Sequence, residues 1–196
     1  MSPMSRMKIL ASAAPLLALS ACLGGAKVPP ELLTLTAASA PAPAQPRSAA
    51  QGQVITVTSP TVPQAINTNR VAVYVAPTSI QYLKGGQWAD KPNELFRLLL
   101  SETLASRTGW VVLDPSVYTQ VQGATLGGQL LRFGYDPSRG EAVVLFEANL
   151  TRPQQAVSTN RFEARVPAAP AEAAQVASAL NQAANQVAAQ VADWAR

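Results

Sequence analysis

The stretch RVAVYVAPTSIQYLKGGQWADKPNELFRLLLSETLASRTGWVVLD, residues 70–114, decides the fold of this chain. Residues 70–76 alternate in character, which predicts a strand, and residues 78–83 form a second short extended piece. Leucines and a phenylalanine then recur three and four residues apart, so we expect a helix from about 92 to 107. WVVLD, residues 110–114, is expected to form a buried strand. This order of elements indicates a sheet with a helix packed on it.

Residues at both ends of the expected helix favour these bounds. Asp90 or Lys91 serves as the N-cap, Pro92 occupies the first turn, and Glu94 lies near the positive end of the helix dipole. Gly109 stands where a left-handed residue commonly ends a helix, so we expect it in that conformation.

Tyr82 and Trp88 flank the Gly85-Gly86 pair, and such an arrangement could be a ligand-gripping loop. We interpret the two glycines instead as a turn between the extended segment and the helix. Trp88 is then expected to pack where the helix enters the domain. The alternative is that Tyr82 and Trp88 contact a partner or ligand.

The rest of the chain completes a single α+β domain, expected over residues 53–196. VITV, residues 54–57, reads as a strand, and residues 125–166 form a meander with a turn at 136–140. Strands joined by short polar turns should be antiparallel. An alanine-rich helix is expected at 171–196. We therefore predict a mixed, mostly antiparallel sheet with two main helices packed on one side.

The C-terminal helix has two different faces. Its apolar stripe contains Val176, Leu180, Ala184, Val187, Val191 and Trp194. Its other face is almost uncharged and contains Gln175, Asn181, Gln182, Asn185, Gln186 and Gln190. We expect the helix to cover one face of the sheet, and the uncharged Asn/Gln face could also support packing between subunits. A membrane-surface helix is disfavoured because the polar face lacks Lys and Arg.

The N-terminus is expected to be a signal peptide, residues 1–21. Arg6 and Lys8 precede an apolar run from residue 9 to residue 19. That run is about eleven residues, shorter than the roughly 20 needed to span a bilayer as a helix. A secretory leader is therefore the better interpretation.

Leu-Ser-Ala-Cys, residues 19–22, resembles a bacterial lipobox, in which the cysteine carries diacylglycerol and an N-acyl chain. A buried free cysteine is the alternative for Cys22, the only cysteine of the chain. Leu23 follows the cysteine rather than Asp, which implies the inner leaflet of the outer membrane. Residues 22–52 are rich in Pro and Ala and are expected to form a tether. Within the tether, an apolar patch could dock as a short edge strand: Leu32, Leu33 and Leu35.

Composition excludes several functions. The formal net charge is +4, and removing Arg6 and Lys8 with the leader leaves +2, without a basic cluster, which argues against nucleic-acid binding. The chain has no histidine and one cysteine, which removes His-based and Cys/His catalysis and most zinc sites. The candidate carboxylates each have an ordinary place as a cap, turn or exposed strand residue: Asp90, Glu94, Glu102, Asp114, Asp136, Glu141, Glu147 and Glu163. We expect no catalytic residue and no metal site.

Residues 70–114, together with the preceding TVPQAINTNRVAV, resemble the ABC-type transport auxiliary lipoprotein family, the DUF330-like domain. The resemblance includes a strand that opens with Arg-Val, a Leu-rich helix and the spacing of Tyr82 to Trp88-Ala89-Asp90. It also includes an Ala/Asn/Gln-rich helix that ends near Trp194. Together with the lipobox, these features extend over roughly residues 22–196.

The resemblance implies a periplasm-facing lipoprotein that works with an MCE-domain protein and an ABC permease and ATPase. Such systems move phospholipids or other hydrophobic molecules between membranes, and the auxiliary subunit docks the machine at the outer membrane, often as an oligomer. It implies no enzyme and no cofactor beyond the covalent lipid on Cys22. One alternative is a carrier that shuttles the hydrophobic ligand in an apolar cavity of its own. A further alternative is an outer-membrane assembly or secretion accessory lipoprotein.

Overall fold

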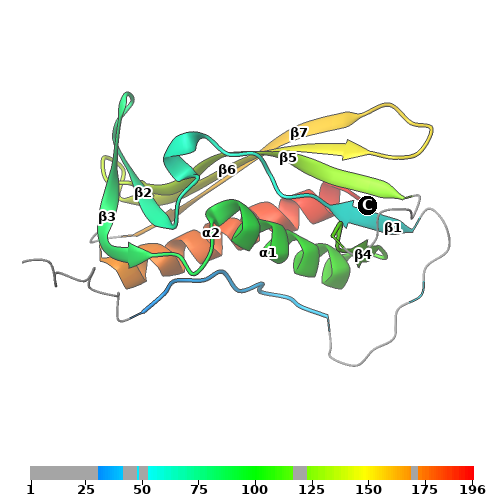
Figure 1. Cartoon of the computed structure of the whole chain (residues 1–196), viewed down its shortest axis with the longest axis horizontal. Helices are drawn as coiled ribbons and strands as arrows, with labels where there is room; N and C mark the ends of the chain where they lie inside the picture. The colour runs from blue at the N-terminus through cyan, green and yellow to red at the C-terminus, as the bar shows by residue number, and fades with distance from the viewer. Residues whose placement is uncertain (1–30, 42–47, 49–52, 117–122, 169–171) are drawn as a thin grey trace, which may run out of the picture. The chain divides into compact units, whose positions relative to one another are not determined.

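The computed structural model describes residues 31–41, 48, 53–116, 123–168 and 172–196 of the chain. The expected signal peptide, the lipobox and Cys22 lie outside the described residues, so those expectations stay predictions. The described residues contain seven strands, one short 3-10 helix and two α-helices (Figure 1). The strands are β1 (Val54–Val57), β2 (Arg70–Ala76), β3 (Ser79–Gln87), β4 (Val111–Leu113), β5 (Ala124–Asp136), β6 (Glu141–Thr151) and β7 (Ser158–Pro167). The helices are η1 (Gln64–Ile66), α1 (Pro92–Arg107) and α2 (Ala173–Trp194).

All seven strands form one mixed sheet with the long strand β5 at its centre. One edge of β5 pairs with β6 in antiparallel orientation, and β7 follows outside β6. The other edge is shared, because β1 pairs with its first residues and β2 with its last ones, both in parallel. Outside these, β4 is parallel to β1 and β3 is antiparallel to β2. The predicted α+β class, sheet and helices are confirmed.

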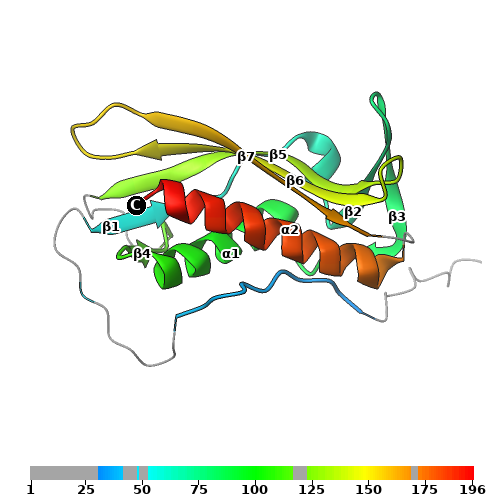
Figure 2. The same ribbon diagram turned by 180° about the vertical axis from the view of Figure 1, so that it is seen from behind.

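Both helices cover the same face of the sheet and lie next to each other (Figures 1 and 2). The small side chains of α2 allow close approach to the strands, and most of its predicted stripe is fully buried. Trp194 is half-buried and contacts Phe162 of β7, with 5.7 Å between ring centroids. Phe96 of α1 meets Phe146 of β6 edge to face at 5.1 Å. The stripe therefore packs on the sheet, and side chains fill the space between the layers.

The N-terminus of α1 is as predicted from the sequence, but its C-terminus is not. Lys91 is the N-cap, Pro92 is the first helical residue and Glu94 lies in the first turn. The expectation for Gly109 is wrong, because its φ is not positive. Thr108 ends the helix in an extended conformation, and both its N–H and its hydroxyl donate to the Leu104 carbonyl, at 3.0 and 2.6 Å. The Thr108 hydroxyl thus adds a second hydrogen bond to the Leu104 carbonyl at the end of the helix.

The prediction of a turn at Gly85-Gly86 is also wrong, because both glycines lie inside β3. The register passes from Arg70 opposite Gln87 to Ala72 opposite Tyr82, so two residue steps on β2 face five on β3. The three extra residues bulge out of the ladder, with Gly85 at a φ of 76°. The chain reverses earlier, between the end of β2 and the start of β3.

Part of the predicted tether is bound to the domain. Leu33 donates its N–H to the Gln87 carbonyl and accepts from the Ala89 N–H, each at 2.8 Å. This is a single bridge beside Trp88 and not the edge strand that seemed possible. Leu35 and Ala37 pack against the core behind it. We call residues 33–39 the strap; the predicted tether 22–52 is therefore not free of the domain along its whole length.

Candidate functional site

Trp88, one of the two predicted site residues, lies in the core. It is 1% exposed, and its ring lies 5.4 Å from that of Phe133. Its indole N–H is buried and has no hydrogen-bond acceptor among the described residues. The structure thus agrees with the packing interpretation, and the Trp88 side chain offers no surface to a partner in this fold.

Tyr82, the other predicted site residue, lies half-buried on β3 beneath an arginine. The Arg70 guanidinium carbon is 3.8 Å from the centroid of the Tyr82 ring, and the phenol hydroxyl donates to the Ala65 carbonyl at 3.2 Å. A cation over an aromatic face is a favourable pairing that holds both side chains. Tyr82 and Trp88 therefore do not share a site, because one is held at the sheet edge and the other is inside. A partner contact at Tyr82 stays a prediction.

The strap is held by two asparagines of α2. The Asn181 Oδ1 accepts from the Thr36 N–H at 2.9 Å. The Asn185 Oδ1 accepts from the Ala38 N–H at 2.6 Å, and its Nδ2 donates to the Thr36 carbonyl at 2.9 Å. An amide side chain has both a donor and an acceptor, so it can replace the backbone of a neighbouring strand. Part of the uncharged face of α2 thus binds the chain's own strap.

The far end of the strap reaches the C-terminal turn of α1. The Ser106 hydroxyl lies 2.7 Å from that of Ser39 and donates to the Ser39 carbonyl at 2.9 Å. The strap therefore runs from the end of β3 along α2 to the end of α1, as the blue segment in Figure 2 shows. On the strap's side most of these contacts use backbone groups, so no sequence motif indicated them.

A hollow of about 670 Å³ lies between the tip of the β2–β3 hairpin and the β5–β6 turn. We call it the hairpin hollow. One wall is uncharged and contains Val75, Ala76, Pro77 and Ile80. The other wall is polar and contains Tyr74, Arg132, Asp136, Ser138 and Arg139. Sequence reasoning missed this site, because its walls come from segments about sixty residues apart.

Charged groups in the polar wall are ordered by their neighbours. The Arg132 guanidinium stacks 4.2 Å from the Tyr74 ring centroid and lies 3.8 Å from the Asp136 carboxylate. Asp136 also accepts from the hydroxyl and the N–H of Ser138, at 2.6 and 3.2 Å. These hydrogen bonds, with the nearby Arg132, hold the Asp136 pKa below its ordinary value. In the described part of the chain, the exposed Arg139 guanidinium has no ion-pair partner.

Burial acts on Tyr74 in the opposite direction. Its hydroxyl accepts the Phe133 N–H at 3.0 Å and is largely removed from water. Desolvation raises the pKa of Tyr74, although the hydrogen bond from Phe133 and the charge of Arg132 both oppose the shift. Tyr74 is therefore a neutral, packed part of the wall at physiological pH.

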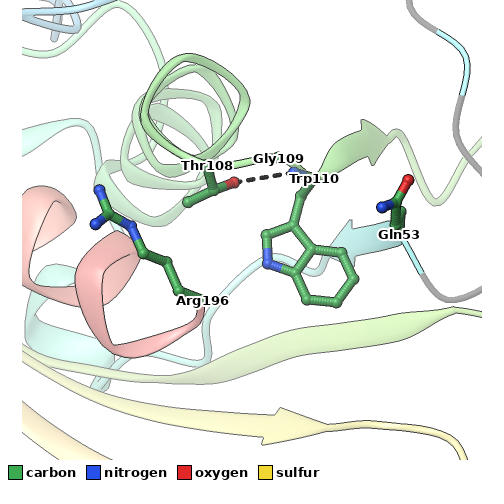
Figure 3. Close-up of a pocket in the computed structure, with 5 residues that line it drawn as sticks. All are labelled: Gln53, Thr108, Gly109, Trp110 and Arg196. Carbon is green, nitrogen blue, oxygen red and sulfur yellow. Dashed lines mark hydrogen bonds between the residues drawn. The ribbon is translucent and has the colours of Figure 1, made fainter.

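A second hollow, of about 250 Å³, lies at the C-terminal end of the described domain (Figure 3). Trp110 forms one side, and its indole N–H donates to the Ala195 carbonyl at 2.9 Å. The Thr108 hydroxyl accepts the Trp110 N–H at 3.2 Å, and the Arg196 side chain extends away from the indole (Figure 3). The polar groups here are used for structure, and the space is small for a phospholipid.

The candidate carboxylates do not converge on a catalytic or metal site. Glu94 and Asp114 both pair with Arg97, at 3.1 and 3.5 Å. Hydrogen bonds from Ser116 hold the Asp114 pKa below its ordinary value. The remaining pairs lie on the sheet: Arg161 with Glu147, and Arg165 with Asp136, Glu141 and Glu163. Within the described ranges, no group of three or more potential ligands could hold a metal ion.

No helix in the described part of the chain is both long and apolar enough to cross a membrane.

The structure defines a class of small α+β domain, with a mixed seven-stranded sheet, two helices on one face and a strap bound across them. A family model described as the ABC-type transport auxiliary lipoprotein component matches residues 33–192, and the chain belongs to this family. It is therefore an auxiliary lipoprotein component of ABC-type transport systems, which implies a membrane anchor. No curated protein matches the sequence significantly.

Solved structures agree on the fold. Protein XCC0632 from Xanthomonas campestris, a DUF330 protein, has a TM-score of 0.68 and 21% identity over 84% of this chain and 94% of its own. An uncharacterised protein has a TM-score of 0.65 and 20% identity over 82% of this chain and 98% of its own. The PelC dodecamer from Paraburkholderia phytofirmans has a TM-score of only 0.41 and 16% identity, over 78% of this chain and 91% of its own. At these identities the likeness concerns the fold, and PelC is too distant to inform function.

Proposed function

We propose that this chain is a non-catalytic docking subunit of an MCE-type ABC transport system that moves phospholipids or other hydrophobic molecules between membranes. In this proposal it is anchored through acyl chains on Cys22 in the inner leaflet of the outer membrane, and it faces the periplasm. Its partners are the MCE-domain protein and, through it, the permease and ATPase. The family membership supports the transport role and the lipid anchor.

The observation that carries the docking role is the filled interior of the domain. The space between helices and sheet is occupied by large side chains that are less than 2% exposed, Trp88, Phe96, Phe133 and Phe146 among them. A carrier needs an enclosed apolar cavity of several hundred Å³. The one hollow of that size described above has a charged wall with two arginines and an aspartate. A fully packed domain on a lipid anchor therefore fits a docking subunit that holds its partner proteins at the membrane.

Crosslinking in native membranes tests this function. Membranes that contain the lipidated protein are treated with an amine-reactive crosslinker, and the protein is captured with its neighbours. We expect an MCE-domain protein or an ABC subunit to be captured with the wild type and to be reduced in a Cys22→Ala variant, which lacks the anchor. Capture of neither partner from wild-type membranes would overturn the docking role.

Native mass spectrometry separates the docking role from the carrier role. The proposal predicts that the protein, released from membranes in mild detergent, has the mass of the chain plus its covalent lipid and carries no other bound lipid. One additional, non-covalent phospholipid per monomer that survives extensive exchange would favour the carrier. Self-association, which remains a prediction, is read from the same spectra.

A further inference from the structure

The strap shortens the distance that the proposed anchor can span. Leu33 is bound to the end of β3, so at most eleven residue steps separate it from Cys22. A fully extended chain of that length reaches about 40 Å. A free tether up to residue 52 would reach about 100 Å on the same scale. The Pro/Ala-rich residues 42–52 thus connect two parts of the fold and add nothing to the reach.

The strap enters the fold at the hairpin that carries the hollow. Leu33 bonds to Gln87, which pairs with Arg70 at the start of β2, whereas the hollow is lined by residues 74–77 around the end of β2 at Ala76. Six residues of strand correspond to about 20 Å. The hairpin tip is therefore within the reach of the anchor, with length to spare.

The hairpin tip has the composition of a surface that meets a bilayer. Between Arg70 and Lys84 the thirteen residues carry no charge, and Ile80 is 41% exposed near the tip. In both views the β2–β3 hairpin projects from the body of the domain (Figures 1 and 2). An uncharged projection that exposes an isoleucine beside cationic side chains suits contact with an anionic membrane interface.

Two arginines lie beside this uncharged tip. Arg132 is held in place by Tyr74 and Asp136, while Arg139 is exposed and unpaired among the described residues. Counting Asp136, the charged groups that line the hollow sum to +1. Guanidinium groups form paired hydrogen bonds with phosphate oxygens, so an anionic headgroup is the fitting occupant.

We propose that the hairpin hollow binds the phosphate headgroup of an anionic phospholipid in the bilayer, with Arg132 and Arg139 on the phosphate and the β2–β3 tip in contact with the lipid surface. This inference rests on the anchor at Cys22 that the proposed function includes. It adds a second contact with the membrane, which would orient the domain as well as tether it.

A unique fluorophore on the hairpin tip tests the contact. The only native thiol is on Cys22 and is acylated in the anchored protein, so a Thr78→Cys variant is labelled at one site. The lipidated protein is reconstituted in vesicles of phosphatidylcholine alone or mixed with phosphatidylglycerol, and an environment-sensitive dye is read. Gln155→Cys, in the β6–β7 turn at the other end of β6, is the matched control.

The expected result is a blue shift and stronger emission from the Thr78 label in vesicles with phosphatidylglycerol, and little change from the Gln155 label. Arg139→Gln should weaken the response to phosphatidylglycerol about fivefold in half-saturating lipid, since one arginine near an anionic surface contributes that factor. Arg161→Gln removes a charge outside the hollow and should leave the response unchanged. Soluble glycerol phosphate should neither reproduce nor displace the response.

Three results would overturn the inference: equal emission in neutral and anionic vesicles, an unchanged response in Arg139→Gln, or an equal response from the Gln155 label. Displacement by soluble glycerol phosphate would instead show a site for a free phosphate ester, and the bilayer contact would be wrong. Flotation of the same vesicles reports the anchor separately. Partner crosslinking reports the docking role, so failure of either is distinguishable from failure of the hollow.

Discussion

Replacing Asn185 with alanine should loosen the strap without unfolding the domain. The side chain donates to the Thr36 carbonyl and accepts from the Ala38 N–H, and the substitution removes both hydrogen bonds together with a bond to the Asn181 carbonyl within the helix. Each contributes about 0.5–1.5 kcal/mol net, and partial exposure places the pair near 1–2 kcal/mol. The free energy of opening the strap should fall by that amount. Global stability should fall less, because alanine improves the helix by about 0.6 kcal/mol.

Amide hydrogen exchange measured residue by residue is the assay. The Ala38 N–H loses its acceptor in Asn185→Ala, and its exchange should accelerate about 5- to 30-fold, the factor that corresponds to 1–2 kcal/mol. The Thr36 N–H keeps its bond to Asn181 and should change less. Asn181→Ala should reverse that order.

The matched control is Gln186→Ala, on the same helix one residue further. Gln186 is exposed and makes no hydrogen bond in the described structure, so its removal should leave strap exchange unchanged. Unaltered exchange at Ala38 in Asn185→Ala, or equal acceleration in Gln186→Ala, would refute the assignment of the strap contacts.

Three further substitutions test the core, a backbone constraint and acid sensitivity by chemical denaturation. Trp88→Ala should cost about 3–5 kcal/mol of the free energy of unfolding, while Trp88→Phe should cost less, since the buried indole N–H has no acceptor among the described residues; equal losses would contradict this. Gly128→Ala should lower the free energy of unfolding by about 2–5 kcal/mol, because φ is +142° and a Cβ would come within 2.0 Å of the Glu147 carbonyl oxygen. Gly109→Ala is the control: a Cβ there meets nothing within 4 Å, so the substitution should be neutral or slightly stabilising. The pKa of Asp136 is lowered in the folded state, so its contribution to stability is complete above the ordinary value of 3.8 and is lost as pH falls through the folded value. Asp136→Asn should therefore lower stability at pH 7 and make stability depend less on pH in acid. An unchanged dependence on pH in acid would contradict this.

The sequence predicted those helices and strands that are determined by a short local pattern of residues. Leucine spacing, Pro92 and Glu94 located α1, and the apolar stripe located α2 and the face it buries. Gly85 and Gly109 were misread because each was judged by residue type alone. A glycine in a bulge is identified by the count of residues on the opposite strand, and the end of α1 used the hydroxyl of Thr108.

The strap and the hairpin hollow could not be read because their partners are far apart in sequence. Thr36 and Asn181 are separated by 145 residues, and the contact uses a backbone group that any residue except proline possesses. Ile80 and Arg139 line the same hollow only because β2 and β5 are parallel neighbours. Such pairings depend on the order of strands in the sheet, which hydrophobic periodicity does not encode.

The strap also affects the order in which parts of the domain can fold. Residues 33–39 leave the ribosome before any other part of the domain, yet their partners on α2 are made almost last. The strap contacts can therefore form only after the last helix has been made, when all seven strands of the sheet are already synthesised. Closing a loop over such a separation in sequence is slow. The position of two asparagines on the last helix therefore makes the attachment of the first segment a late step in folding.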